Sequence, residues 1–552
     1  MGNDVFTFIV GGKAGEGVKK AGEVAAKMFV LKGLHVFLMD DYMSLIRGGH
    51  NFSVISAADR PITSHYMRAN LVVNSDRRSY EKHKTHLSED GVLIYNQEKS
   101  KDLEGFGIPL MEETKKYKMK ELMYGVGAVA TLAAAIDLSK KELNQILEDE
   151  YPSGKKDNLA YASKIYDLAH DKIGGKFQLN QGDKQRTMIT GNEAISLGAL
   201  GAGLNCYYGY PMTPTSSILH FLAKKAPDFD IAVVHPENEI AVINMAIGSA
   251  YAGAKTMVGS SGGGVALMSE GISLAGMAEV PILVIYSMRA GPASGVPTYT
   301  EQADLGFALN LGHGEFPRIV ASPGSIEEAY YLTAEMLDLV WKFQTPGILL
   351  TEKHLSESKM DIELELDLTS WAMPKLHENG DYKRYLDTEN GISPLLFPPS
   401  DELIKWNSYE HDESGITTED EEVITQMHDK RFRKAESLLK YLKNKNTINT
   451  YGSSGPLIFT YGSTTMSVLE ALQYSEREAQ VIQPRFLKPF PVWELSQFHD
   501  ESAIVVEQSK AGQFSQLLTE KTKIQPTALI NRYDGRPFEP IQLAKKIKEV
   551  IS

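Results

Sequence analysis

The chain has 552 residues, of which 42% are apolar and 46 are glycine, so it can form about three or four domains with sizeable cores. The formal net charge of −14 argues against binding to nucleic acid or to an anionic membrane, because both need a basic protein face. The single cysteine, Cys206, excludes an internal disulfide and leaves the chain unable to hold an iron–sulfur cluster or a thiolate zinc site by itself.

No apolar run in the sequence approaches the roughly 18 residues that a membrane-spanning helix needs. The first residues, Met-Gly-Asn-Asp, lead into a predicted strand without the basic region or the cleavage site of a secretory signal. We therefore expect a cytoplasmic protein that has neither a membrane nor a nucleic acid as a partner.

The first predicted unit begins with a strand, a glycine loop and a helix. Residues 4–10 predict the strand, 11–17 the loop and 18–31 the helix, and a second strand at 35–39 ends at Asp40. An acid at the end of the second strand is also found in dinucleotide-binding sites, but the glycines here lack the G-x-G-x-x-G spacing of those sites. A nicotinamide dehydrogenase that uses this loop therefore stays an alternative to a tight structural turn.

A polar glycine turn follows at residues 44–51 and contains Arg47, His50 and Asn51. Their donors could bind a phosphate or a carboxylate, or the segment could be a satisfied structural turn. The polar stretch 174–187 predicts an exposed linker. We expect a first domain at residues 1–178 and the start of the next at residue 188.

The second predicted unit opens with a small-residue helix at 194–202, capped by residues 191–193, and a strand at 204–208. The sequence Tyr-Pro-Met-Thr-Pro-Thr-Ser at 210–216 then predicts a tight loop before a helix, with Thr213 as the N-cap and Pro214 at the first helical position. Such connections, at the carboxyl ends of parallel strands, are where α/β proteins hold ligands.

Two similar connections follow. A strand at 231–235 leads into Pro-Glu-Asn-Glu, where burial of Glu237 would raise its carboxyl pKa and suit it to proton transfer. The alternative is that Glu237 or Glu239 only favours the first turn of a helix. Next, Ser261 and Gly262 open a glycine run before a helix at 265–275. These glycines either let a planar or phosphate group approach the backbone or fill a crowded turn.

Arg289 lies just past a mostly aliphatic strand at 280–286. A guanidinium there could bind a substrate carboxylate with two hydrogen bonds, and Thr298 could add a hydroxyl, although a surface arginine on a mobile loop has the same pattern. A helix that ends at Phe343 and a strand at 347–351 complete a central domain, which we place at 188–375.

Residues 376–450 are charged and interrupted by prolines, which predicts a solvated connector. The run Glu-His-Asp-Glu at 410–413 could be read as a metal site, but one histidine among carboxylates lacks the spacing of a closed site, so we expect none. From Pro456 a third α/β unit begins, and we place the last domain at 451–552.

The order of these motifs resembles the 2-oxoacid:ferredoxin oxidoreductases, thiamine-diphosphate enzymes that oxidatively decarboxylate pyruvate, 2-oxoglutarate and related acids. Residues 210–214 resemble the Tyr-Pro-Ile-Thr-Pro signature of their α subunits, and the segments 191–194, 237–241, 261–264 and 289–304 follow in family order. The segments 11–17 and 46–51 resemble the γ subunit. This resemblance spans almost the whole chain.

The resemblance implies a fused γα subunit of α/β class with three α/β domains: an N-terminal γ-type domain, a central parallel sheet of the thiamine-diphosphate-binding type, and a C-terminal domain like that of transketolase. That last domain mainly builds subunit contacts in the family. This chain has Met212 where the family usually has Ile, Gly263 where Pro is common, and Leu395 where an arginine is frequent.

The resemblance also implies roles for particular residues. Glu237 would activate the aminopyrimidine ring of the cofactor, and Thr213 and Arg289 would hold the 2-oxoacid, which makes these three the candidate catalytic residues. Further substrate contacts would come from Tyr210 and Thr298, further cofactor contacts from Pro211, Ser261 and Gly262, and coenzyme A access would involve Arg47, His50 and Asn51.

The sequence has no Gly-Asp-Gly segment for a Mg²⁺ ion beside the diphosphate and no cysteine cluster. The resemblance therefore implies a β subunit that carries Mg²⁺, a [4Fe–4S] cluster and the other half of the thiamine diphosphate site, in an assembly of two αβ units. Coenzyme A would be the co-substrate and ferredoxin the electron acceptor. A non-catalytic assembly subunit is the remaining alternative, and the preferred acid, 2-oxoglutarate or pyruvate, stays open.

Overall fold

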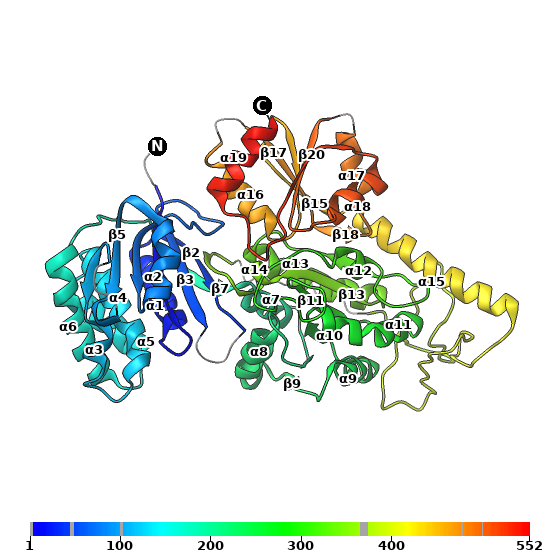
Figure 1. Ribbon diagram of the computed structural model, residues 1–552. Helices are drawn as coiled ribbons and strands as arrows, with labels where there is room; N and C mark the ends of the chain where they lie inside the picture. Colours follow the sequence, from blue (N-terminus) through cyan, green and yellow to red (C-terminus); the bar gives the residue numbers. More distant parts are fainter. Residues whose placement is uncertain are drawn as a thin grey trace. The chain divides into compact units, whose positions relative to one another are not determined.

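The computed structural model describes residues 4–44, 49–99, 103–364, 374–475, 478–499 and 501–551. Its chain divides into two compact units, and Figure 1 labels their helices and strands. The first unit comprises Met1–Ile189, Glu357–Glu363 and Glu539–Leu543, and the second comprises Thr190–Ser356, Leu364–Phe538 and Ala544–Ser552. The borders of the four segments that we place from the sequence stay predictions.

A mixed sheet forms the centre of the first unit, in the order β6-β5-β4-β1-β3-β2-β14-β7. Its strands are β1 (Phe6–Lys13), β2 (His35–Asp41), β3 (His50–Ala58), β4 (Ala69–Asn74), β5 (Leu87–Asn96), β6 (Phe106–Ile108), β7 (Thr187–Thr190) and β14 (Lys359–Ile362). Strand β1 is parallel to β4 and antiparallel to β3. The carboxyl ends of β1 and β4 therefore lie at the same edge as the start of β3.

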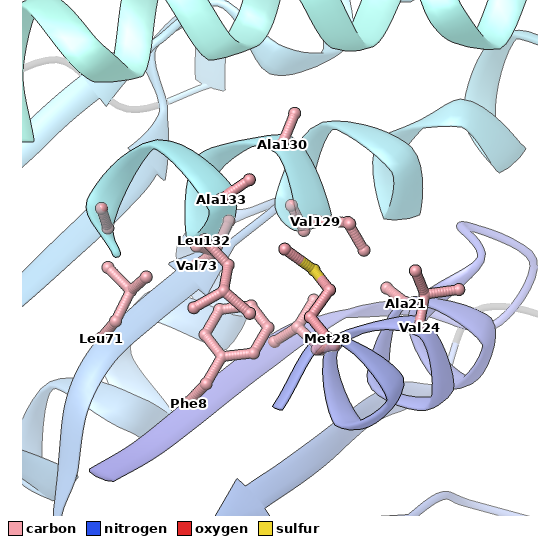
Figure 2. Close-up of a cluster of buried hydrophobic side chains, with 14 of the residues drawn as sticks. Phe8, Ala21, Val24, Met28, Leu71, Val73, Val129, Ala130, Leu132 and Ala133 are labelled. Carbon is pink, nitrogen blue, oxygen red and sulfur yellow. The ribbon is translucent and has the colours of Figure 1, made fainter. Parts of the chain in front are cut away.

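Helices cover this sheet: α1 (Val18–Leu31), α2 (Arg77–His83), α3 (Leu110–Thr114), α4 (Tyr124–Ala135), α5 (Lys140–Glu150) and α6 (Lys155–Ile173), with single turns at Lys84–His86, Gln97–Lys99 and Lys120–Met123. All residues of α4 are buried, and Figure 2 shows Val129 and Leu132 among side chains from β1, β4 and α1. A Cβ on Gly127 would lie 2.4 Å from the Tyr161 hydroxyl, so glycine there permits α6 to pack directly on α4.

The structure corrects two predictions for this unit. Strand β1 continues through Gly11 and Gly12 to Lys13, so the glycine loop is shorter than predicted. His50 and Asn51 belong to β3 and not to a turn, because Lys13 and Gly12 pair with them in antiparallel register.

The second unit contains two sheets. The central sheet has the order β18-β12-β13-β11-β10-β8-β9, and every strand except the antiparallel β18 runs parallel to its neighbours. Its strands are β8 (Cys206–Gly209), β9 (Ala232–Val234), β10 (Thr256–Ser260), β11 (Leu283–Met288), β12 (Ile319–Ala321), β13 (Gly347–Glu352) and β18 (Phe486–Lys488). Strands β10, β11 and β13 are entirely buried, as the aliphatic runs predict for the interior of a parallel sheet.

The smaller sheet of the second unit has the order β15-β17-β16-β19-β20. Its strands are β15 (Ile448–Tyr451), β16 (Leu457–Phe459), β17 (Gln480–Pro484), β19 (Ala503–Glu507) and β20 (Pro526–Asn531). Strands β17, β16, β19 and β20 are parallel, and β15 is antiparallel to β17. The three sheets contain parallel strands that are connected by helices along the chain, and this confirms the predicted α/β class.

The helices of the second unit and the chain end are α7 (Gly191–Gly201), α8 (Ser216–Phe229), α9 (Glu239–Tyr251), α10 (Gly262–Leu267), α11 (Ser269–Met277), α12 (Leu305–Leu309), α13 (Ile326–Phe343), α14 (Lys353–Glu357), α15 (Glu421–Leu442), α16 (Thr464–Leu472), α17 (Val492–Leu495), α18 (Gln513–Thr522) and α19 (Pro540–Ile551), with a single turn at Ser496–Phe498. The helix predicted at 265–275 is interrupted at Met268 and forms α10 and α11.

The prediction of Thr213 as N-cap and Pro214 as first helical residue is wrong. The backbone N–H and the hydroxyl of Thr215 both donate to the Met212 carbonyl, at 2.8 and 2.9 Å, and this turn delays the start of α8 to Ser216. The peptide bond between Thr213 and Pro214 is cis.

The prediction of a solvated segment at 376–450 is also wrong in part. Arg384 and the α15 residues Lys430 and Lys434 are buried, and both lysines pair with the buried carboxylate of Glu279, which follows α11. Arg384 donates to the carbonyl of Glu279 at 2.8 Å. Charged side chains that look solvent-exposed in the sequence therefore anchor α15, the long yellow helix in Figure 1, to the central part of the second unit.

Candidate active site

The candidate residues of the second unit follow the carboxyl ends of four neighbouring strands. Tyr210 comes directly after β8, Glu237 lies three residues after β9, Ser261 follows β10, and Arg289 follows β11. These strands are adjacent and parallel in the order β11-β10-β8-β9. Because the carboxyl ends of parallel strands share one edge, the structure brings these residues to a single edge of the central sheet, where α/β proteins bind their ligands.

Arg289 links two of the connections at this edge. Its Nη1 donates to the backbone carbonyl of Thr213 at 2.9 Å, so the guanidinium lies against the loop after β8. Burial lowers the pKa of Arg289, while the Asp304 carboxylate raises it, and a guanidinium keeps its charge in proteins. Its Nε is buried without a hydrogen-bond partner among the described residues. Arg289 therefore has a charged donor available for an anion.

Two hydroxyl groups near this edge are also buried without a partner in the described part of the chain. They are Ser261 Oγ and Thr298 Oγ1, and the two residues are 0% and 4% exposed. Leaving a buried hydroxyl unpaired costs about 1–3 kcal/mol. Such atoms, together with Arg289 Nε, fit a site at which a polar ligand supplies the missing partners.

The structure separates the two acids after β9. Glu237 is exposed, so the burial expected for it is wrong, whereas Glu239 is 3% exposed as the first residue of α9. Ser260 Oγ donates to Glu239 Oε1 at 3.4 Å, and a Cβ on Gly264 would lie 2.3 Å from the same oxygen. The buried carboxylate at the sheet edge is thus that of Glu239, packed against the glycine turn after β10.

Asp304 is a further acid at this edge that the motif analysis does not single out. A Cβ on Gly262 would lie 3.2 Å from its Oδ2, and burial raises the pKa of Asp304 while Tyr286 and Arg289 lower it. Asp304 is the N-cap residue of α12. An acid at the end of a glycine- and proline-rich loop, directly before a helical pattern, is the signal that could have identified it.

Asn192 holds the loop after β8. Its buried Nδ2 donates to the Pro214 carbonyl at 2.7 Å and to Ser217 Oγ at 2.8 Å. The neighbouring Glu193 forms a capping box with Thr190 at the start of α7. Pro211 is exposed, and the half-exposed ring of Tyr210 meets His235 edge to face, with a centroid distance of 5.8 Å.

Gly11 and Gly12, which lie near the end of β1 before the loop of the first unit, are packed closely against neighbouring side chains. A Cβ on Gly11 would lie 2.3 Å from Ser79 Oγ, and one on Gly12 would lie 2.6 Å from the Glu16 carboxylate. Asp40 is 5% exposed and accepts a hydrogen bond from Ser53 Oγ at 2.5 Å, so it does not present a free carboxylate to a ribose. These glycines permit close packing, as in the structural alternative.

Of the three residues proposed for coenzyme A access, Arg47 lies outside the described residues. Asn51 is half-buried, and its Oδ1 accepts a hydrogen bond from the Met43 N–H at 3.4 Å. His50 is 4% exposed, and its Nε2 lies 2.9 Å from His83 Nε2. Burial lowers the pKa of His50 to about 4, so this imidazole is neutral near pH 7. The role of the three residues stays a prediction.

No group of three or more His, Cys, Asp or Glu side chains in the described ranges is arranged to hold a metal ion. In the acidic run at 410–413, Glu410 accepts two hydrogen bonds from Arg431, at 2.9 and 2.7 Å, and the ring of His411 packs on Tyr385. Within these described ranges, no helix has the length and the apolarity required to cross a membrane.

Known proteins match both units. The family described as "Pyruvate flavodoxin/ferredoxin oxidoreductase, thiamine diP-bdg" matches residues 197–430, and "Pyruvate ferredoxin/flavodoxin oxidoreductase" matches residues 7–168. The 2-oxoacid:ferredoxin oxidoreductase subunit alpha of a Sulfolobus species is 29% identical over 99% of this chain and 97% of its own.

The 2-oxoglutarate synthase subunit KorA of Archaeoglobus fulgidus is 31% identical over 59% of this chain and 88% of its own length. Among solved structures, the 2-oxoglutarate:ferredoxin oxidoreductase from Magnetococcus marinus with 2-oxoglutarate, coenzyme A and succinyl-CoA bound has a TM-score of 0.90 and 28% identity. That similarity covers 100% of both chains.

Proposed function

This chain belongs to the 2-oxoacid:ferredoxin oxidoreductase family, and we propose that it is the fused γα subunit of a coenzyme A-acylating member. With a β subunit it converts a 2-oxoacid and coenzyme A to acyl-CoA and CO₂ and passes two electrons to ferredoxin. The observation that carries this proposal is the arrangement at the carboxyl edge of the central sheet. Arg289 donates a hydrogen bond to the Thr213 carbonyl there, and the buried Glu239 and the unpaired hydroxyl of Ser261 follow neighbouring strands.

The residues at this edge fit the pyrimidine side of thiamine diphosphate. When bound, the cofactor supplies a thiazolium carbon that attacks the 2-oxo group and an electron sink for the loss of CO₂. The buried carboxyl of Glu239 meets the requirement for a hydrogen bond with the cofactor ring better than the exposed Glu237, because Ser260 and the glycine turn after β10 exclude water from it. We therefore assign the ring contact to Glu239, with Gly262, Ser261 and Pro211 lining the cofactor.

Arg289 binds the substrate carboxylate in this proposal, with Thr213, Thr298 and Tyr210 beside it. We expect Arg289→Ala to raise the KM for the 2-oxoacid about 10- to 100-fold, since hydrogen bonds to charged groups contribute about 1.5–3 kcal/mol each. Steady-state kinetics of the αβ complex over a range of oxoacid concentrations measure the effect. The KM for coenzyme A is expected to stay within about twofold, because the proposal places Arg289 at the oxoacid carboxylate and not at coenzyme A.

Arg318→Ala is the matched control for this experiment. Arg318 is also a largely buried arginine with an unpaired Nε, but it precedes β12 and thus lies at the amino-terminal edge of the central sheet. Its loss is expected to lower stability without a selective change in the oxoacid KM. An unchanged KM in Arg289→Ala would show that the carboxylate binds elsewhere.

A β subunit completes the site. The sequence has no Gly-Asp-Gly segment, and its one cysteine cannot hold a cluster, so Mg²⁺, the diphosphate contacts and the [4Fe–4S] cluster belong to the partner in an assembly of two αβ units. A cytoplasmic location remains part of the proposal.

Purification of the chain with and without its β partner tests the function. We expect the chain alone to lack the visible absorption of an iron–sulfur cluster and to show negligible ferredoxin reduction. The complex should reduce ferredoxin with 2-oxoglutarate or pyruvate, and a branched oxoacid included in the same assay defines the selectivity. Robust activity of the chain alone would refute the divided site, and an assembled complex inactive with every acid would favour a non-catalytic assembly subunit.

A further inference from the structure

Gln302 lies in the loop between Arg289 and α12 and connects the two sheets of the second unit. It is 0% exposed, and its Nε2 donates to the Tyr461 carbonyl at 2.9 Å. Its Oε1 accepts hydrogen bonds from Thr464 Oγ1 at 2.8 Å and from the Gln508 N–H at 2.9 Å. The Gln302 N–H in turn donates to the Gln508 carbonyl at 2.8 Å. Both ends of the side-chain amide are thus paired inside the protein.

The partners of Gln302 follow the carboxyl ends of strands in the smaller sheet. Tyr461 and Thr464 come after β16, and Gln508 comes after β19. The connection after β20 contributes as well, since the Gly535 carbonyl accepts a hydrogen bond from the Thr300 N–H at 3.1 Å. One short stretch of the loop, 300–302, is therefore held by three strand-to-helix connections of the C-terminal sheet.

The connection after β16 is itself fixed from the central sheet. The Ser463 N–H donates at 2.5 Å to Oε1 of Glu352, a fully buried carboxyl at the end of β13. Gln508 Nε2 also donates to Thr464 Oγ1 at 3.1 Å. The acceptor and donor groups that Gln302 meets are therefore preorganised, and little freedom remains at this point of the loop.

Gln302 lies between two groups of the candidate active site. Thr298, with its unpaired buried hydroxyl, precedes it by four residues, and Asp304, whose carboxylate influences the pKa of Arg289 and lies against Gly262, follows it by two. Burial raises the pKa of Tyr461 and the Asp304 carboxylate adds to this shift, and Gln513 of α18 bonds the loop on both sides of Asp304, through the Ala303 carbonyl and the Gly306 N–H. A shift of the backbone at 302 would move both groups relative to Arg289.

We propose that Gln302 is a positioning residue for oxidative decarboxylation, through which the C-terminal sheet sets the place of Thr298 and Asp304 at the substrate. The inference rests on the proposed function and goes beyond it, because it gives the C-terminal domain a part in substrate recognition in addition to subunit contacts. A misplacement of about 1 Å at a reacting centre can cost on the order of 10²-fold in rate, so small changes in this connection suffice.

The test uses the αβ complex with two kinds of variant. Gln302→Met keeps the volume and removes every side-chain hydrogen bond, and Thr464→Val removes the hydroxyl that donates to Gln302. Each is expected to lower kcat/KM for the oxoacid about 10- to 100-fold while the KM for coenzyme A changes less than about twofold. Thr464→Ser retains the hydroxyl and is expected to recover most of the parental value.

Gln483→Met is the matched control. Gln483 is a buried glutamine in β17 of the same sheet, with hydrogen bonds to Glu328, Asn449 and Tyr451 and none to the loop at 296–304. Its loss is expected to reduce thermal stability without a selective effect on the oxoacid. Should Gln302→Met fail to fold, the comparison of Thr464→Val with Thr464→Ser decides the question.

The possible outcomes separate the two claims. If the parental complex oxidises no oxoacid, the proposed function fails and the inference fails with it. If the parental complex is active and Gln302→Met or Thr464→Val keeps the parental kcat/KM, only the positioning role is overturned. Equal losses in Thr464→Val, Thr464→Ser and Gln483→Met would assign Gln302 a purely structural role and would also overturn it.

Discussion

Glu239→Gln is expected to slow the decarboxylation by about 10²- to 10⁴-fold, the range typical for removal of an acid or base group, whereas Glu237→Gln keeps a rate near that of the parent. The physical reason is the difference in burial between two acids that are two residues apart. Glu239 is 3% exposed against Ser260 and Gly264, and Glu237 is exposed. An amide at 239 keeps the shape of the side chain but cannot share a proton with the cofactor ring.

Single-turnover formation of CO₂ by the αβ complex measures this step apart from ferredoxin reduction. Glu237→Gln serves as the control, since it removes the same charge from the same connection. Equilibrium binding of thiamine diphosphate to each complex shows whether the slow variant still holds the cofactor. A normal rate in Glu239→Gln together with a slow Glu237→Gln would return the role to Glu237 and would imply that the β subunit buries it.

The choice between these two acids illustrates what the sequence could predict. The repeated pattern of an aliphatic strand, a small-residue turn and a helix correctly indicated which connections lie at the carboxyl edge of the central sheet. It did not indicate which acid points inward, because that depends on the first helical residue. Asn238 accepts the Ala241 N–H at 3.0 Å as the N-cap, so Glu239 begins α9 and turns toward the glycine run. The preference of asparagine for N-caps was the available signal.

Other features had no local signal at all. Gln302 meets Tyr461 at a separation of 159 residues, and Glu279 meets Lys430 at 151. Contacts of this kind depend on how distant segments pack, which the periodicity of one sequence does not encode. The same limit explains why α15 was expected to be solvated. Charged side chains on a helix are usually exposed, and they become buried only where they pair with a buried group of opposite charge.

Glu279→Gln is expected to destabilise the second unit by about 3–5 kcal/mol, because it leaves two lysine charges buried without their counterion. Lys430 Nζ lies 2.7 Å from Glu279 Oε1, Lys434 pairs with Oε2, and the carboxylate is 2% exposed. Glutamine keeps the volume of the side chain and can still accept hydrogen bonds. The decrease in the free energy of unfolding therefore reports the missing charge and not a cavity. Urea unfolding followed by tryptophan fluorescence should show an earlier midpoint for the variant.

The pKa of Glu279 determines how the stability of the folded protein changes with pH. Burial alone would raise the pKa of Glu279, but Lys430, Lys434 and Arg384 together hold it well below its ordinary value of 4.5. A carboxyl whose pKa is lower in the folded state contributes stability above its unfolded pKa and loses that contribution as the pH falls. The parent should therefore lose stability below about pH 4.5, and Glu279→Gln should lack this part of the acid response. Glu520→Gln, which disrupts an exposed pair with Lys521, should leave the stability close to that of the parent. A similarly small change in Glu279→Gln would mean that water or a rearranged acceptor solvates the two lysines and that the cluster does not anchor α15.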